Sequence, residues 1–97
     1  MSKLGEEQRA FARYFPVLMI VAHAMGYEVT FPAEHLNHIK NSRHFDGRAK
    51  DINLFKDGKY LTKTEDHLPL GLIWESLGGV WGGRWEDGNH YSWGEKR

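Results

Sequence analysis

Two clusters of histidine and aspartate residues have the types and spacing needed to bind a metal ion. In the first, His44 is followed by a glycine turn and then by Asp51, so that two ligand side chains can fold onto one point. In the second, Asp87 precedes His90 by three residues, and Gly88 lets the backbone bend between them. Two histidines and one carboxylate leave a fourth tetrahedral position for water, which is the arrangement of a catalytic zinc.

A zinc ion held by His44, Asp51 and His90 would lower the pKa of its bound water to near 7 and polarise a scissile carbonyl. Asp87 could then take the proton of that water and pass it to the leaving amine. The helical His-Glu-x-x-His motif of other zinc peptidases is absent. Spacing alone leaves the assignment open, because Asp51, like Asp46 and Asp57, could be an ordinary turn or strand-end residue.

The composition excludes several other classes of function. The 97 residues contain no cysteine, so disulfide frameworks, cysteine-based zinc sites and thiol nucleophiles are ruled out. The formal net charge of zero argues against nucleic acid or an anionic membrane as a partner. The longest apolar run, Phe15 to Ala22, is shorter than the ~20 residues of a membrane span. We expect one domain over residues 1–97, monomeric and made in the cytoplasm.

Apolar periodicity predicts two helices. The first runs from Glu6 to Met25 and ends at Gly26, with a kink or break expected at Pro16. The second covers residues 70–77, with a proline near its start and two glycines past its end. The four tryptophans, of which Trp74 lies in this second helix, are expected to be mainly core and cleft-wall residues.

Alternating residues and Asp-Gly turns predict the strands. A strand over residues 27–31 is followed by a loop or helical turn over 33–43 and by a strand over 49–55 with a return over 59–62. Residues 80–93 are expected to form a loop that leads into a short final strand. On this reading Asn53 shares a strand face with Asp51 and supports it by a hydrogen bond. The predicted fold class is α+β, with two helices beside a small antiparallel sheet.

Two motifs make the chain resemble a known peptidase family. The run Ser42-x-His44-x-x-Gly47-x-Ala49-x-Asp51 and the later Asp87-x-x-His90-Tyr91 are similar to the paired motifs of the M15 family of zinc peptidases. That family includes D-alanyl-D-alanine dipeptidases and carboxypeptidases and the L-alanyl-D-glutamate endopeptidases of phage endolysins. The resemblance implies zinc on His44, Asp51 and His90, Asp87 as the catalytic base, and a hedgehog-like α+β fold.

The resemblance further implies a peptidoglycan stem peptide as the substrate, reached from the cytoplasm after a separate factor opens the way. One segment departs from the family, since residues 31–41 contain no arginine where members usually have one that holds the substrate. The positive charge could instead come from Arg43, Arg48 or Arg84. The candidate substrate-binding residues are Ser42, Arg43, Arg84 and Trp81. Two alternatives stay open: a D,D-carboxypeptidase or dipeptidase acting on soluble peptides, and a non-catalytic cell-wall binding module with a structural zinc.

Overall fold

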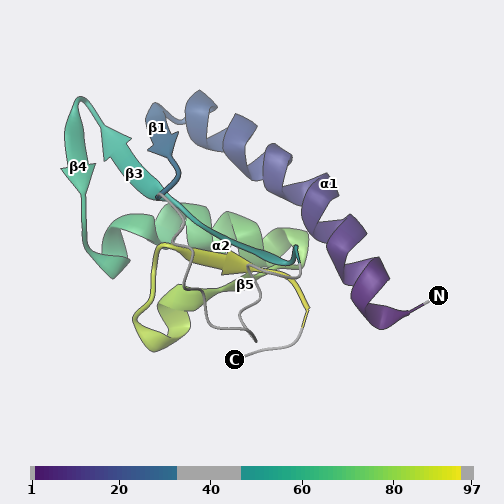
Figure 1. Ribbon diagram of the computed structural model, residues 1–97. Helices are drawn as coiled ribbons and strands as arrows, with labels where there is room; N and C mark the ends of the chain where they lie inside the picture. The colour runs from purple at the N-terminus through teal and green to yellow at the C-terminus, as the bar shows by residue number, and fades with distance from the viewer. Residues whose placement is uncertain (1, 33–46, 95–97) are drawn as a thin grey trace.

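The computed structural model describes residues 2–32 and 47–94 (Figure 1). Within these ranges it contains two α-helices, two short 3₁₀ helices and two three-stranded antiparallel sheets. The predicted α+β class is confirmed, although the strands form two sheets where one was expected. The elements, in chain order, are α1 (Lys3–Ala24), β1 (Tyr27–Thr30), β2 (Ala49–Asp51), β3 (Asn53–Lys56), β4 (Lys59–Leu61), η1 (Thr64–His67), α2 (Leu68–Leu77), β5 (Val80–Trp81), η2 (Gly82–Trp85) and β6 (His90–Ser92).

Helix α1 runs unbroken from Lys3 to Ala24 through Pro16, so of the kink or break predicted there the break does not occur. Proline cannot donate a backbone hydrogen bond, and the carbonyl of Ala12 loses its helical partner. Both residues lie on the exposed face of the helix, where water can bind this carbonyl, while both halves of the helix pack on the same core. The N-terminus is capped by Ser2, whose hydroxyl accepts a hydrogen bond from the N–H of Gly5 at 3.0 Å.

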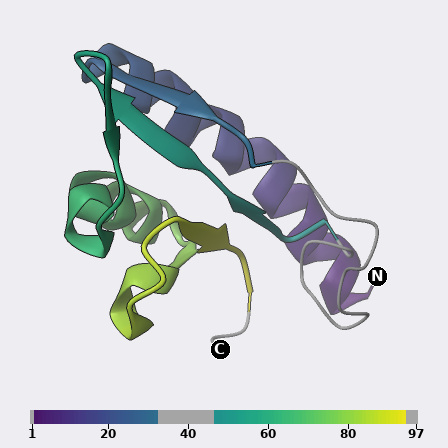
Figure 2. The same cartoon turned by 60° about the vertical axis from the view of Figure 1, so that its left-hand side comes forward.

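The first sheet has the strand order β1-β3-β4. The connection between β3 and β4 is the predicted Asp-Gly turn, in which Asp57 and Gly58 both have positive φ values of 54° and 76°. Two positive φ values match the type I′ turn that suits the twist of a two-residue hairpin. Figure 2 shows β1 and β3 lying alongside α1, which covers this sheet.

The second sheet has the order β2-β6-β5. The single strand predicted over residues 49–55 is therefore two strands, of which only the first belongs to this sheet. The predicted strand is divided at Ile52, whose side chain is fully buried and whose N–H donates to the carbonyl of Asn89 at 3.0 Å. Residues before Ile52 pair with β6, and residues after it pair with β1 and β4. One segment of chain therefore crosses from one sheet to the other at a buried residue.

Helix α2 begins two residues earlier than predicted and ends as predicted at Gly78, which has a φ of 110°. The expected loop over residues 80–93 is largely ordered, because Val80 and Trp81 pair with β6 as strand β5 and η2 follows. No helix in residues 2–32 or 47–94 is both long and apolar enough to cross a bilayer.

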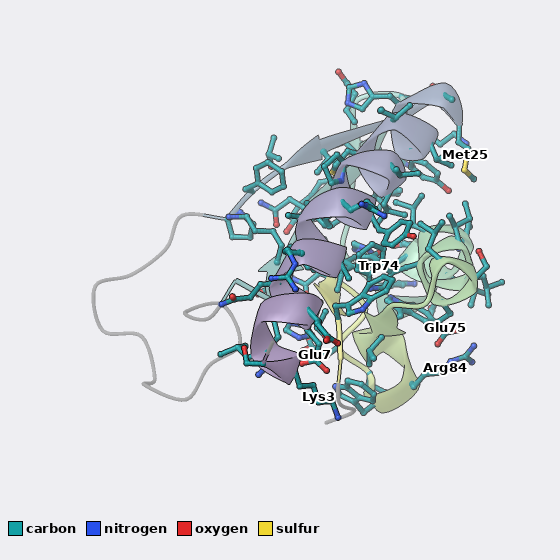
Figure 3. All side chains as sticks on the ribbon, turned by 90° about the vertical axis from the view of Figure 1, so that its right-hand side faces the viewer. Lys3, Glu7, Met25, Trp74, Glu75 and Arg84 are labelled. Atoms are coloured by element: carbon teal, nitrogen blue, oxygen red, sulfur yellow. The ribbon has the colours of Figure 1, made fainter. Side chains whose placement is uncertain are left out.

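Trp74 of α2 lies at the centre of the core and is completely buried. Its ring makes edge contacts with aromatic rings of α1 and of the C-terminal segment, at centroid distances of 5.4–6.3 Å: Phe11, Phe15, Tyr91 and Trp93. Its indole N–H donates to the carbonyl of Ser92 in β6 at 2.8 Å. Figure 3 shows Trp74 between the two helices. This one side chain therefore holds β6 against both helices.

A largely buried ion pair joins the start of α1 to the start of β2. The guanidinium of Arg48 donates to the carboxylate of Glu7, and their side chains are only 14% and 11% exposed. The neighbouring carbonyl of Arg48 accepts a hydrogen bond from the N–H of Trp93 at 2.9 Å. The pair therefore fixes where β2 enters the second sheet.

We predict that Glu7→Ala lowers the free energy of unfolding by about 2 kcal/mol, because it leaves a largely buried guanidinium without its carboxylate. The matched control is Glu6→Ala, which removes an exposed carboxylate from the same turn and should change it by less than about 0.5 kcal/mol. Urea denaturation of both variants measures the difference. Equal losses in the two variants would show that the pair does not contribute.

Candidate active site

The pairing of β2 with β6 brings together two of the predicted metal ligands. Asp51 and His90 are directly opposed in the antiparallel register, at the end of β2 and the start of β6. The Nδ1 atom of His90 lies 3.0 Å from Oδ1 of Asp51. The His90 side chain is 8% exposed and that of Asp51 is 38% exposed. One carboxylate and one imidazole therefore converge at a partly open end of the second sheet.

Asp87 lies in the tight loop between η2 and β6. Its N–H donates to the carbonyl of Gly82 at 2.9 Å, and its own carbonyl accepts from the N–H of His90 at 3.1 Å. A side chain at Gly82 would put its Cβ 2.3 Å from the carbonyl oxygen of Asp87, so only glycine fits this turn. The loop is thereby held in one shape, with the half-buried Asp87 three residues before the predicted ligand His90.

Trp81 helps to hold this loop and is a core residue. Its ring is only 3% exposed, and its indole N–H donates to the carbonyl of Gly88 at 2.8 Å. The faces of the ring are covered closely by Gly71 and Gly83, where an added Cβ would lie 2.2 Å and 2.1 Å from ring atoms. We therefore assign Trp81 to the support of the loop and not, as predicted, to substrate contact.

A polar cavity lies beside this loop. Its lining comes from the residues after Asp51, from strand β4 and 3₁₀ helix η1, and from the loop before His90: Ile52, Asn53, Tyr60, Leu61, Thr62, Lys63, Thr64, His67, Glu86, Asp87, Gly88 and Asn89. Ile52 and Leu61 are its apolar side chains. Asp87 thus faces a space in which a polar molecule could lie, as a proton-transferring residue must.

His67 is a residue of the cavity wall that sequence reasoning missed. It is 3% exposed, and its Nδ1 lies 2.9 Å from the hydroxyl of the fully buried Tyr91. Burial lowers the pKa of His67 below its usual 6.5, against a smaller opposing effect of Asp66. Burial likewise raises the pKa of the Tyr91 phenol, which stays protonated. The two residues are 24 positions apart, so only the folded chain reveals the contact.

Of the other predicted site residues, the structure describes Arg84, which is paired with a carboxylate. Ser42, Arg43 and His44 lie outside the described residues. Arg84 is exposed and donates two hydrogen bonds to the carboxylate of Glu75, at 2.9 Å and 2.7 Å, and these bonds raise its pKa. Figure 3 shows this pair on the outer surface of α2 and η2. Glu75 is therefore a partner of Arg84, as Glu7 is of Arg48.

The predicted support of Asp51 by Asn53 is wrong. Because the chain changes sheets at Ile52, Asn53 belongs to β3, where its amide donates to the hydroxyl of Thr30 at 3.2 Å. Its carbonyl accepts a hydrogen bond from the hydroxyl of Tyr60 at 3.3 Å. The assumption of one continuous strand led to this error.

The donor atoms of the two described candidate ligands, Asp51 and His90, suit zinc. A carboxylate and an imidazole are both ordinary zinc ligands, and they already lie in contact. Within residues 2–32 and 47–94 no three His, Cys, Asp or Glu side chains come together. A third ligand from the segment 33–46, which contains His44, would complete the set, and that segment leads directly into β2.

The buried state of His67 makes stability depend on pH. Because its folded-state pKa is lowered, the unfolded chain binds a proton that the folded chain does not, and stability is lost as the pH falls below about 6.5. We expect the free energy of unfolding of metal-free protein to fall between about pH 7.5 and pH 5.5, and to fall less in His67→Asn. Urea denaturation with a chelator present measures both slopes. Identical slopes would mean that His67 does not contribute.

Comparison with known protein families supports the chemistry of this site. The family model described as D-alanyl-D-alanine carboxypeptidase, an M15 peptidase model, matches residues 37–93. The match covers more than half of the chain and includes both motifs, Asp51, Asp87 and His90. A search of curated proteins finds no match. With the paired motifs and this match in agreement, the chain belongs to the M15 peptidase family.

Proposed function

We propose that the protein is a zinc-dependent hydrolase of peptidoglycan peptides, of the type found in phage endolysins. The observation that carries this proposal is the opposed pair of Asp51 and His90, with Asp87 in the loop beside it. Membership of a family of peptidases supports the reaction class. The substrate is then a stem peptide, cleaved at an amide bond next to a D-amino acid.

The residues have distinct roles in this mechanism. His44, Asp51 and His90 hold the zinc, which when bound supplies a Lewis acid for the scissile carbonyl and lowers the pKa of water. Asp87 accepts the proton of the attacking water and delivers it to the nitrogen of the leaving amine. The backbone hydrogen bonds of Asp87 to Gly82 and His90 hold the backbone from which its carboxylate projects at a constant place relative to His90.

The metal assignment predicts about one zinc per chain after purification without chelator, and its loss in His90→Ala and His44→Ala. His23→Ala is the matched control, because His23 is an exposed histidine in the last turn of α1 and is not a predicted ligand. Elemental analysis of the four proteins, with circular dichroism to verify folding, makes the measurement. A folded wild-type protein without zinc, or a His90→Ala protein that keeps it, contradicts the ligand set.

The catalytic assignment predicts that Asp87→Asn lowers the rate of hydrolysis at least ~100-fold while zinc stays bound, because general acid–base transfer contributes about that much. The substrate is purified sacculi, and release of new amino groups is measured. Glu65→Gln, an exposed carboxylate of η1, is the control and should retain the wild-type rate. An inactive wild type that holds zinc would overturn the proposed reaction.

The description of the matching family favours a second substrate class, in which the enzyme removes a terminal D-alanine from soluble peptides. Synthetic stem peptides separate the two, since an endopeptidase cuts internal bonds that a carboxypeptidase leaves intact. A non-catalytic cell-wall binding module based on the tryptophans would need exposed tryptophan rings on which glycan could stack. Trp74 and Trp81 are buried in the core, and Trp85 and Trp93 are half-buried, so this basis is lost.

A further inference from the structure

We propose that the face of the first sheet that points away from α1 is a sugar-binding platform for the glycan strand to which a stem peptide is attached. This inference rests on the proposed function and deepens it, because it names a second part of the same polymer that the enzyme recognises. The platform consists of five side chains that three strands present on one face of the sheet: Glu28, Thr30, Asn53, Phe55 and Tyr60.

The strand register places these side chains together. Glu28 is opposed to Phe55 and Phe55 to Tyr60, while Thr30 is opposed to Asn53. Opposed residues of antiparallel strands point to the same face, and alternate residues of one strand share a face. The other face of the sheet packs into the core with α1. Of the five platform side chains, three are exposed and two are half-buried, so together they form an outer surface.

Two aromatic rings, neither of them a tryptophan, supply the apolar part of the platform. Phe55 and Tyr60 stack across β3 and β4, with ring centroids 5.1 Å apart and an interplanar angle of 27°. Tyr60 nevertheless remains 54% exposed, so much of its ring is open to a ligand. A pyranose presents a face of C–H groups that packs on the electron-rich face of an aromatic ring. Because Phe55 already orients the Tyr60 ring, little side-chain freedom is lost on binding.

A chain of hydrogen bonds runs beside the rings. The amide of Asn53 donates to the hydroxyl of Thr30 at 3.2 Å, and the hydroxyl of Tyr60 donates to the carbonyl of Asn53 at 3.3 Å. These bonds orient the three groups and leave further capacity, because an amide has two N–H groups and a hydroxyl both donates and accepts. The hydroxyl and acetamido groups of amino sugars also donate and accept, so they match this row of neutral groups.

Charge and position favour a neutral glycan over an anionic polymer. Glu28 is the one charged group among the five platform side chains, and its carboxylate would repel an anionic polymer. Asn53 and Tyr60 also line the polar cavity that contains Asp87. The platform is therefore continuous with the proposed catalytic site, and a glycan bound on it holds its attached peptide close to Asp87.

The test is a titration of isotope-labelled protein with chitotetraose, a soluble neutral chain of N-acetylated sugars, followed by the chemical shifts of the backbone amides. In the wild type, shift changes should cluster on the platform residues. Tyr60→Ala should raise Kd at least about fivefold because the ring is lost, and Tyr60→Phe, which keeps the ring, by no more than about twofold. Phe31→Ala is the matched control, because Phe31 is 50% exposed but packs on Phe15 of α1, and it should keep the wild-type Kd.

This measurement requires no catalysis, so it separates the platform from the proposed reaction. Chitotetraose binding on the platform by a zinc-loaded protein that cleaves no stem peptide would refute the reaction and leave the platform in place. Absence of platform shifts with chitotetraose, or a wild-type Kd in folded Tyr60→Ala, overturns the platform whether or not the protein hydrolyses sacculi. Platform shifts caused by a sugar-free stem peptide and not by chitotetraose also overturn it, since the surface would then bind peptide.

Discussion

The antiparallel pairing of β2 with β6 is the constraint on which the rest of the site depends. These strands are only three residues long, yet their register opposes Asp51 to His90 across 39 positions of sequence. A slip by one residue would turn every side chain of a strand to the other face of its sheet and separate the two proposed ligands. The division of the chain at Ile52 enforces the register, because this residue is buried and its N–H is bonded to Asn89.

Strands this short cannot hold their register by ladder hydrogen bonds alone. Packing and hydrogen bonding of the aromatic core also hold them in register. Trp74 packs against rings of α1 and bonds the carbonyl of Ser92 in β6. The Glu7–Arg48 pair connects α1 to the other strand of the pair. Both paired strands are thus attached to the helices. A loss of core packing far from the proposed ligands should therefore shift these strands and so change the relative position of Asp51 and His90.

The loop before His90 combines two structural requirements. On one side it is held by the indole of Trp81 and by a glycine contact in the core, so it cannot move freely. On the other side it faces a polar cavity lined in part by η1, which is joined to the loop by the hydrogen bond from the N–H of Gly88 to the hydroxyl of Thr64. A rigid support beneath a polar, accessible surface is what a proton-transferring carboxylate needs, since its distance to the substrate must stay constant.

The sequence by itself determined the two motifs, the α+β class, both helices and the β3–β4 hairpin, because these depend on local spacing, apolar period and turn chemistry. Local patterns could not show that Pro16 would leave α1 unbroken, since the outcome depends on which helix face is exposed. Nor could they show the change of sheet at Ile52 or the contact of His67 with Tyr91. These features follow from pairing and burial between distant segments, which only the tertiary structure decides.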